Sequence, residues 1–242
     1  AACKTDPVAA LNDRIARAGA AQDAAGTGNN SLLQLADRFA AAGDHKAAIP
    51  LYRRASASPA ITRAASVEPL LGLARSLAAT GALDPALATL EKAAARAAED
   101  PRVPALRGNI LLMKGETAKA MPEIYRALAL DPASPEALRG MAGIYDLTGR
   151  HAEALATYQQ ILAQDPTDAR TLNNYGLSLA LNDAPDDGIR VLKQALESPA
   201  AGAAQRQNLA LAYILRGEEA EARKLVSIDS GQAGADQQLR AL

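Results

Sequence analysis

The side chains best suited to chemistry in this sequence are two histidines, one cysteine and a few groups of carboxylates. Each histidine directly follows a pair of residues that starts with glycine: His45 follows Gly43-Asp44, and His151 follows Gly149-Arg150. A zinc site needs three or four protein ligands, and neither histidine has a cysteine or a third histidine beside it. We therefore expect both histidines to face water at the start of a helix, with a metal site as the alternative reading.

The carboxylates lack the spacing that catalysis or calcium binding requires. DAPDD at 183–187 supplies acids of the kind that favour a helix N-terminus. Glu218, Glu219 and Glu221 lie beside Arg216, which is the pattern of a mixed, solvated helix face. The glycine and the distant glutamate of a calcium loop are absent, as are a Gly-x-Ser-x-Gly motif, a phosphate loop and a dinucleotide fingerprint. The sequence predicts no catalytic residue, no metal site, no cofactor and no small-molecule substrate, and thus a protein that is not an enzyme.

The overall composition argues against a nucleic-acid partner. The 242 residues include 26 basic and 27 acidic side chains, for a formal net charge of -1. Such a balance gives little attraction to a phosphate backbone, and an aromatic content of 3% without tryptophan gives few rings for base stacking. No apolar run is long enough to cross a bilayer.

Cys3 is the single cysteine, so it can form neither an intrachain disulfide nor a cysteine-based zinc site. One reading is an unpaired terminal thiol. The other starts from Ala1 and Ala2, which are the small residues that precede the cysteine of a bacterial lipoprotein cleavage box. In that reading the mature protein begins at Cys3 and carries lipid there, which is the prediction we adopt.

A repeat organises most of the chain. GRHAEALATYQQILAQDP at 149–166 resembles GETAKAMPEIYRALALDP at 115–132 and two earlier segments, 81–101 and 43–59. Aligned on the small residue of the second half, the copies recur every 34 residues after a first interval of 38, at Ala48, Ala86, Ala120, Ala154, Gly188 and Ala222. A period of 34 residues is typical of the tetratricopeptide repeat (TPR), a helix-turn-helix unit.

Other positions follow the same period. A small residue falls in the first helix at Ala36, Ala74, Gly108, Ala142, Gly176 and Ala210, and a bulky one in the second helix at Tyr52, Leu90, Ile124, Tyr158 and Leu192. Small residues let two helices approach closely while the bulky ones fill the space beside them. The turn carries glycine at 43, 81, 115, 149 and 217 and aspartate at 183. We predict an all-α, right-handed superhelical TPR solenoid of about six helix-turn-helix repeats.

The two ends of the chain differ from the repeats. Residues 1–30 are rich in Ala, Gly, Asn and Asp, and we expect a lipid-anchor tether there, with a helix from Pro7 to about Ala20. The solenoid should cover 31–228. Residues 229–242 should break the last helix near Asp229 and form a short capping helix, because the open face of a final repeat needs a cover. The connections around 59–69 and before Pro101 are the longest, and we expect the solenoid to bend or loosen at both.

First-helix positions that packing does not require should line the concave wall of such a solenoid. The predicted peptide-binding groove consists of Leu71, Arg75, Arg102, Asn109, Leu112, Arg139, Arg170, Asn173, Leu177, Gln207 and Leu211, with Leu33, Asp37, Asp146 and Ile214 on the same wall. Arginine and asparagine would donate hydrogen bonds to a peptide backbone or carboxylate, and the leucines would be covered by the peptide. The alternative is a solvated groove whose polar residues keep the chain soluble.

The C-terminal third of the chain resembles one particular family of TPR proteins. The helix pair with LNNYG at 172–176 and RQNLALAY at 206–213, followed by a tail that ends in RAL at 240–242, resembles the TadD family of Flp pilus (tight adherence) assembly lipoproteins. Cys3-Lys4-Thr5 is similar to the lipidated start of that family. TPR architecture by itself indicates an interaction scaffold and no particular partner.

The resemblance implies a non-enzymatic outer-membrane lipoprotein on the periplasmic face, which acts as a pilotin or assembly factor for the secretin of a Flp (Tad) type IV pilus. Its partner would be the secretin or another pilus component, and its only membrane contact would be the lipid on Cys3. The alternative is a soluble cytoplasmic TPR adaptor or chaperone that binds peptide segments of a secretion system or another complex.

Overall fold

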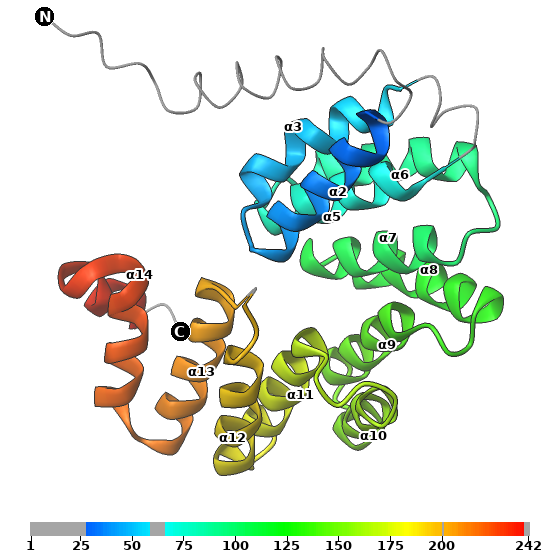
Figure 1. Ribbon diagram of the computed structural model, residues 1–242. Helices are drawn as coiled ribbons and strands as arrows, with labels where there is room; N and C mark the ends of the chain where they lie inside the picture. The colour runs from blue at the N-terminus through cyan, green and yellow to red at the C-terminus, as the bar shows by residue number, and fades with distance from the viewer. Residues whose placement is uncertain (1–27, 59–65, 200, 240–242) are drawn as a thin grey trace, which may run out of the picture. The chain divides into compact units, whose positions relative to one another are not determined.

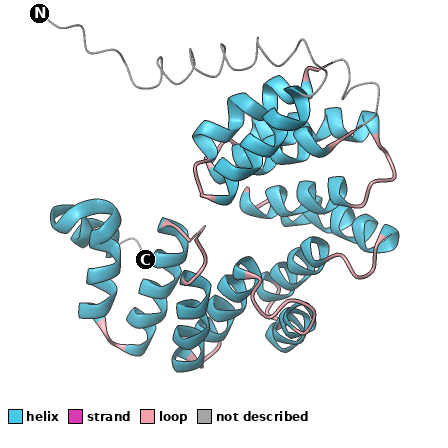
Figure 2. Ribbon diagram, viewed as in Figure 1, coloured by secondary structure: helices cyan, strands magenta, loops and turns pink. Residues whose placement is uncertain are grey.

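The computed structural model describes residues 28–58, 66–199 and 201–239. Every regular element in these ranges is an α-helix (Figure 2). Cys3 and the helix expected from Pro7 to Ala20 lie outside the described residues. The predicted tether of 1–30 is too long at its C-terminal end, because the first described helix already begins at Gly28.

The described helices pair into six antiparallel hairpins, as the repeat predicts (Figure 1). Their bounds are α2 Gly28–Ala41 with α3 His45–Ser56, α5 Glu68–Ala79 with α6 Leu83–Arg96, α7 Arg102–Met113 with α8 Thr117–Leu130, α9 Pro135–Leu147 with α10 His151–Leu162, α11 Ala169–Leu181 with α12 Pro185–Leu196, and α13 Ala203–Arg216 with α14 Glu219–Leu239.

The chain divides into two compact units, residues 1–98 and 99–242. In the first unit, α3 of one hairpin packs against α5 of the next. In the second unit, α7 contacts α9, α9 contacts α11, and α11 contacts α13, so the first helices of successive hairpins are neighbours. The single solenoid domain expected over 31–228 is thus divided between α6 and α7, in the connection that ends near Pro101.

The small and bulky positions of the repeat form the core of each hairpin. Among the small positions, Ala36, Ala74, Ala142 and Ala210 of the first helices and Ala48, Ala86, Ala120, Ala154 and Ala222 of the second helices are completely buried. The bulky second-helix residues Tyr52, Leu90, Ile124, Tyr158 and Leu192 are at most 3% exposed. Burying a large side chain of this kind contributes about 1.5 to 3 kcal/mol, so each of these positions adds substantially to the stability of its hairpin.

Glycines mark the closest helix contacts in the second unit. A Cβ atom on Gly108 would lie 2.5 Å from Cδ1 of Ile124, and a Cβ atom on Gly140 would collide with the same methyl group, so this isoleucine fills space left by two glycines of successive hairpins. Between α11 and α12, a Cβ atom on Gly188 would lie 2.6 Å from the carbonyl oxygen of Gly176. The backbones of these two helices touch where two glycines face each other.

The turn between the two helices of a hairpin uses a left-handed residue. Glycine has a φ between 75° and 87° at five of the turns, and Asp183 takes the same conformation with a φ of 61°. A residue with a Cβ atom pays about 1 kcal/mol for this conformation. The fifth repeat therefore keeps the turn geometry of the others at an energetic cost.

We predict that Asp183→Gly raises the free energy of unfolding by about 0.5 kcal/mol, because relief of the left-handed strain exceeds the added entropy of the unfolded chain. The reciprocal change, Gly149→Asp, should lower it by a similar amount although nothing lies within 4 Å of the new Cβ atom. Urea denaturation followed by circular dichroism measures both. If the wild type and both variants have equal free energies of unfolding, the positive φ is not the reason for glycine at these turns.

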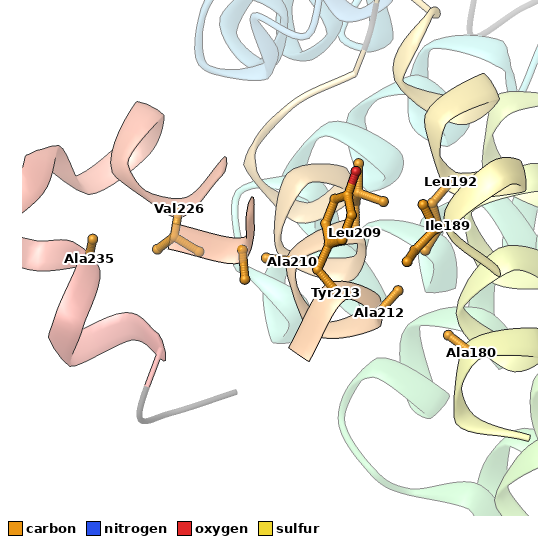
Figure 3. Close-up of a cluster of buried hydrophobic side chains, with 10 residues drawn as sticks. Ala180, Ile189, Leu192, Leu209, Ala210, Ala212, Tyr213, Val226 and Ala235 are labelled. Carbon is orange, nitrogen blue, oxygen red and sulfur yellow. The ribbon is translucent and has the colours of Figure 1, made fainter. Parts of the chain in front are cut away.

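The C-terminal end of the chain folds back onto the last hairpin. Helix α14 is interrupted at Gly231, with a φ of 67°, rather than near Asp229, because glycine adopts this conformation without strain. Beyond the kink, Ala235 is 1% exposed and packs with Val226, Leu209 and Tyr213 in the cluster of Figure 3, and Leu239 contacts the same cluster. The residues beyond the kink thus pack on the last hairpin as far as Leu239, while Leu242 lies outside the described residues.

An ion pair also anchors α14 to α13. Arg206 donates from Nε to Oδ2 of Asp229 at 2.8 Å and from Nη2 to Oδ1 of the same carboxylate. This hydrogen bonding holds the pKa of Asp229 below its usual value. The bidentate geometry aligns α13 and α14 ahead of the kink at Gly231.

Candidate protein-binding site

The residues predicted to line the groove, called here the first-helix set, are divided between the two units. Leu71 and Arg75 belong to the first unit. Leu71 is completely buried, so the prediction that it lines a binding surface is wrong: it is a core residue of α5. Arg75 is half-buried, and its charge acts on the hydroxyl of Tyr52, which donates a hydrogen bond of 2.7 Å to Asp37. Burial and this carboxylate together raise the pKa of Tyr52, so the phenol stays a donor.

In the second unit, the polar members of the set join successive hairpins. Asn109 of α7 donates from Nδ2 to the backbone oxygen of Glu136 in the first turn of α9, at 2.9 Å. Asn173 of α11 is 9% exposed and accepts a hydrogen bond of 3.0 Å from Asn208 of α13. A donor or acceptor engaged in this way is not free to bind a peptide, because losing its partner would leave a buried polar group unsatisfied.

Arg139 has the most complete set of such contacts. Its Nη1 lies 2.5 Å from Oδ2 of Asp168 and 3.2 Å from Oγ1 of Thr171. Asp168 is the N-cap of α11 and accepts from the backbone amides of Arg170 and Thr171. One carboxylate thus caps α11 and binds the guanidinium from α9, which fixes the position of α11 relative to α9.

The remaining members stay accessible to different degrees. Arg102 forms an ion pair with Asp100 across the start of α7, and its side chain is 43% exposed. Leu112 is half-buried and packs on the cluster of Ile124. Half-buried Leu177, Gln207 and Leu211 and exposed Arg170 complete the set. These members, rather than Asn109, Arg139 or Asn173, are the ones a partner segment would meet.

Asp146 lies at the centre of a second polar cluster. It accepts hydrogen bonds from Ser178 Oγ at 2.7 Å and from the hydroxyl of Tyr158 at 3.3 Å, and its Oδ1 lies 3.3 Å from Nδ1 of His151. These contacts come from α9, α10 and α11. Burial, followed by the charge of Asp146, raises the pKa of Tyr158, which keeps that hydroxyl protonated.

A serine, an aspartate and a histidine lie together here, but the aspartate lies between the other two, so the histidine cannot take the serine proton. Ser178 donates to the carboxylate instead of to the imidazole, and it is 2% exposed. A catalytic serine needs a base that takes its proton and access to a substrate. In the first unit the equivalent residues His45 and Ser76 lie 3.4 Å apart, and Ser76 is completely buried. Both clusters hold neighbouring hairpins together.

The expectation that both histidines face water is therefore only half correct. His45 and His151 do begin their helices, but each is half-buried and contacts another polar side chain. Within the described ranges, no three His, Cys, Asp or Glu side chains are grouped so as to hold a metal ion.

Four residues that bond to the predicted site residues were not predicted from the sequence: Asp168, Thr171, Ser178 and Asn208. One signal was available: Ser76 and Ser178 occupy the same position of two repeats, as do His45 and His151. Polar residues that recur at the same packing position of different repeats are a sign of contacts between hairpins. For Asp168, its place directly before the first helix of a repeat is that of a helix N-cap, but the sequence gives no sign of the guanidinium from α9.

We predict that Arg139→Ala lowers the free energy of unfolding by about 2 kcal/mol, because it removes two charge-assisted hydrogen bonds made by a side chain only 13% exposed. Asp168→Asn alone keeps an acceptor for the α11 cap. A double-mutant cycle of the two changes should give a coupling energy of about 1 kcal/mol or more in urea denaturation. Strict additivity would mean that the pair does not join the hairpins.

No described helix is both long enough and apolar enough to span a membrane.

Comparison with known proteins identifies the repeat. A family model of the tetratricopeptide repeat matches residues 39–110 and 111–172, together more than half of the chain. The type IV pilus assembly protein PilF of Pseudomonas aeruginosa is 35% identical over 65 residues, which are 27% of this chain and 26% of PilF. The match therefore spans about a quarter of that relative.

Solved structures agree with the fold. The Cut9 and Hcn1 hetero-tetramer of APC/C matches with a TM-score of 0.70 at 17% identity, over 94% of this chain and 45% of that one. A tetratricopeptide repeat protein from Parabacteroides merdae matches with a TM-score of 0.63 at 14% identity, over 94% and 89% of the two chains. A thermophilic TPR protein of Thermus thermophilus matches with a TM-score of 0.62 at 21% identity, over 77% and 99%. These likenesses show the fold, and the predicted all-α fold of repeated helix-turn-helix units is confirmed: the chain belongs to the tetratricopeptide repeat family.

Proposed function

We propose that this protein is a lipid-anchored, non-enzymatic assembly factor of a type IV pilus of the Flp (Tad) class, which binds a segment of the secretin or of another pilus component. As a tetratricopeptide-repeat protein, the chain is a scaffold for protein-protein interaction.

The observation that carries the pilus assignment is the likeness to PilF. That protein is a type IV pilus assembly protein, and 35% identity over 65 residues exceeds the identity to any of the structural neighbours described above. The resemblance of segments 172–176 and 206–213 to the TadD family supports the same class of machine. Because the likeness to PilF covers a quarter of its length, the partner and the role are inferences for this chain.

A non-enzymatic role agrees with the chemistry of the polar clusters. Ser178, Asp146 and His151 are arranged for structure, with the serine bonded to the carboxylate and shielded from solvent. The accessible members of the first-helix set are leucines, a glutamine and arginines, which suit the backbone and side chains of a bound segment better than they suit a reaction.

The lipid anchor rests on the sequence Ala1-Ala2-Cys3. Acylation at Cys3 would place the repeats beside the outer membrane on the periplasmic face. A single acyl chain binds a membrane only marginally, so stable anchoring requires the multiple acylation of bacterial lipoproteins. Residues 4–27 would then serve as the tether.

The test uses the gene with its own upstream coding sequence and compares the wild type with Cys3→Ser. We expect the wild type to sediment with outer membranes and to incorporate labelled palmitate, and Cys3→Ser to lose both properties because the proposed site of acylation is removed. The matched control is Thr5→Ser, which leaves the cysteine intact and should behave as the wild type does. Outer-membrane sedimentation of Cys3→Ser would contradict the anchor.

The role in assembly is tested separately by the amount of heat-stable secretin multimer in a strain that lacks the gene. Complementation by the wild type should restore the multimer, and Cys3→Ser should restore much less. A normal multimer level without the gene would remove the pilus assignment, while full restoration by Cys3→Ser would favour the soluble adaptor.

A further inference from the structure

A row of exposed apolar side chains recurs at one position of the repeat in the second unit. Each row residue lies at the C-terminal end of a first helix, two residues before the left-handed turn residue. The row, called here the turn-edge row, consists of Met113, Leu147, Leu181 and Leu215, which are 59, 64, 55 and 46% exposed. The interval between them is 34 residues throughout.

Packing within the chain does not account for this row. A single exposed leucine needs no explanation, because much of any protein surface is apolar. Four at the same position are different, since about half of each large side chain is left in contact with water at every copy. The first unit shows this directly: the equivalent positions hold Ala41 and Ala79, which are exposed and small. The large apolar residue is confined to the four hairpins of the second unit.

The row forms one edge of that unit. Its residues are the last of α7, α9 and α11 and the last but one of α13, and these helices contact one another in succession. The first helices of successive hairpins therefore follow one another from α7 to α13 (Figure 1), and the row residues lie at the same end of each. None of the row residues belongs to the first-helix set, so this surface is separate from the proposed binding site.

The charge beside the row is not uniform. The six residues that follow each row residue are 114–119, 148–153, 182–187 and 216–221, and their formal charges are +1, 0, -3 and -2 with histidine neutral. Asp186 is 82% exposed even though it forms an ion pair with Arg216, which also pairs with Glu218. The edge is thus acidic at the α11/α12 and α13/α14 turns, where carboxylates outnumber the basic groups.

The spacing of the row suits a helix. Packed helices lie about 8 to 10 Å apart, so neighbouring row residues should be separated by about that distance. A helix advances about 10 Å in seven residues and returns to nearly the same face. An extended strand advances as far in three residues but then presents the opposite face. One apolar residue in every heptad of a helix would therefore meet one row residue in every hairpin.

We propose that the turn-edge row binds an amphipathic helix of a partner protein, with a large apolar residue at every seventh position and basic residues beside it. Basic flanks complement the acidic turns. A second copy of this chain would bring the same acidic turns onto each other in part, and an anionic lipid surface would be repelled by them. The apolar side chains of the helix would cover the four row residues, and the charges would set its direction along the edge.

The test measures binding of a fluorescently labelled synthetic peptide of about 28 residues to the full 242-residue chain. The peptide carries leucine at every seventh position and lysine or arginine beside each leucine. A second peptide has the same leucines with glutamate as the flanking residue. We expect fluorescence anisotropy to detect binding of the basic peptide, with an affinity that falls as salt is added, and about tenfold weaker binding of the acidic peptide.

The matched variants separate this edge from other apolar surfaces. Leu147→Ser with Leu181→Ser should weaken binding of the basic peptide at least about tenfold while circular dichroism stays unchanged, because both side chains are more than half exposed. Ile228→Ser, at a side chain 67% exposed outside the row, should leave binding unchanged.

Three results would overturn the proposal. In the first, the double variant binds the basic peptide as the wild type does, or the acidic peptide binds equally well. In the second, sedimentation shows a dimer that the double variant abolishes, which would assign the row to a second copy. In the third, the chain floats with anionic phospholipid vesicles and the double variant does not, which would assign the row to a lipid surface.

Discussion

Ile124→Ala is expected to lower the free energy of unfolding by about 4 kcal/mol, near the upper part of the range for a buried isoleucine. Ile124 is completely buried, and its side chain occupies the space above Gly108 of α7 and Gly140 of α9. Glycines have no side chain that could move into the cavity, so the cavity stays open. Urea denaturation followed by helical circular dichroism, with the slope compared between variants, measures the change.

A second substitution tests this explanation. Gly108→Ala alone should destabilise, because its Cβ atom would lie 2.5 Å from Cδ1 of Ile124. In the Ile124→Ala chain the same change should stabilise by about 1 kcal/mol, since it fills part of the cavity and favours the helix. If Gly108→Ala has the same sign in both backgrounds, the two residues do not share one space.

Gly188→Ala is the second large effect, a loss of about 3 kcal/mol. Its Cβ atom would meet the carbonyl oxygen of Gly176 at 2.6 Å and the amide nitrogen of Ala180 at 2.9 Å. These are backbone atoms of α11, so relief requires α11 and α12 to separate along a well-packed interface. A lower urea midpoint, accompanied by loosened packing of Leu192, is the expected result.

Gly143→Ala is the matched control. It also lies within a helix, but its Cβ atom would find only Leu112 Cδ1, at an ordinary 3.7 Å. Helix propensity then dominates, and the change should stabilise by about 0.5 to 1 kcal/mol. Destabilisation of similar size by both substitutions would mean that close helix contact is not the reason for glycine at 188.

Much of the fold followed from the sequence because the repeat has a fixed period. A position that holds Ala or Gly in every copy can only be a close contact, and the burial of Ala48, Ala86 and Ala120 agrees. Gly188 stands where the other copies have alanine, and Asp183 stands where they have glycine. Both residues keep the helix contact or turn conformation of the other copies. Gly188 makes the helix contact closer still, and Asp183 adopts the left-handed turn at a cost in strain.

The candidate site was less predictable, because periodicity says which face a residue occupies but not which partner it has. Asn109 and Arg139 were expected to bind a peptide, and instead they join α7 to α9 and α9 to α11. The position of Leu71 in the repeat predicted that it lines the concave wall. Helix α5, however, buries more of its residues than the other first helices do, and Leu71 is one of them. The division into two units depends on contacts between hairpins, which a repeat pattern does not specify.

The most direct test of the scaffold role is photocrosslinking in the native cell, with a photoreactive amino acid in place of Leu177 in the first-helix set or of exposed Gln160 on α10. The account predicts a crosslinked product containing the secretin or another pilus component from position 177, and none from position 160. Crosslinking to such a protein from position 160 alone, or to no protein from position 177, would contradict it.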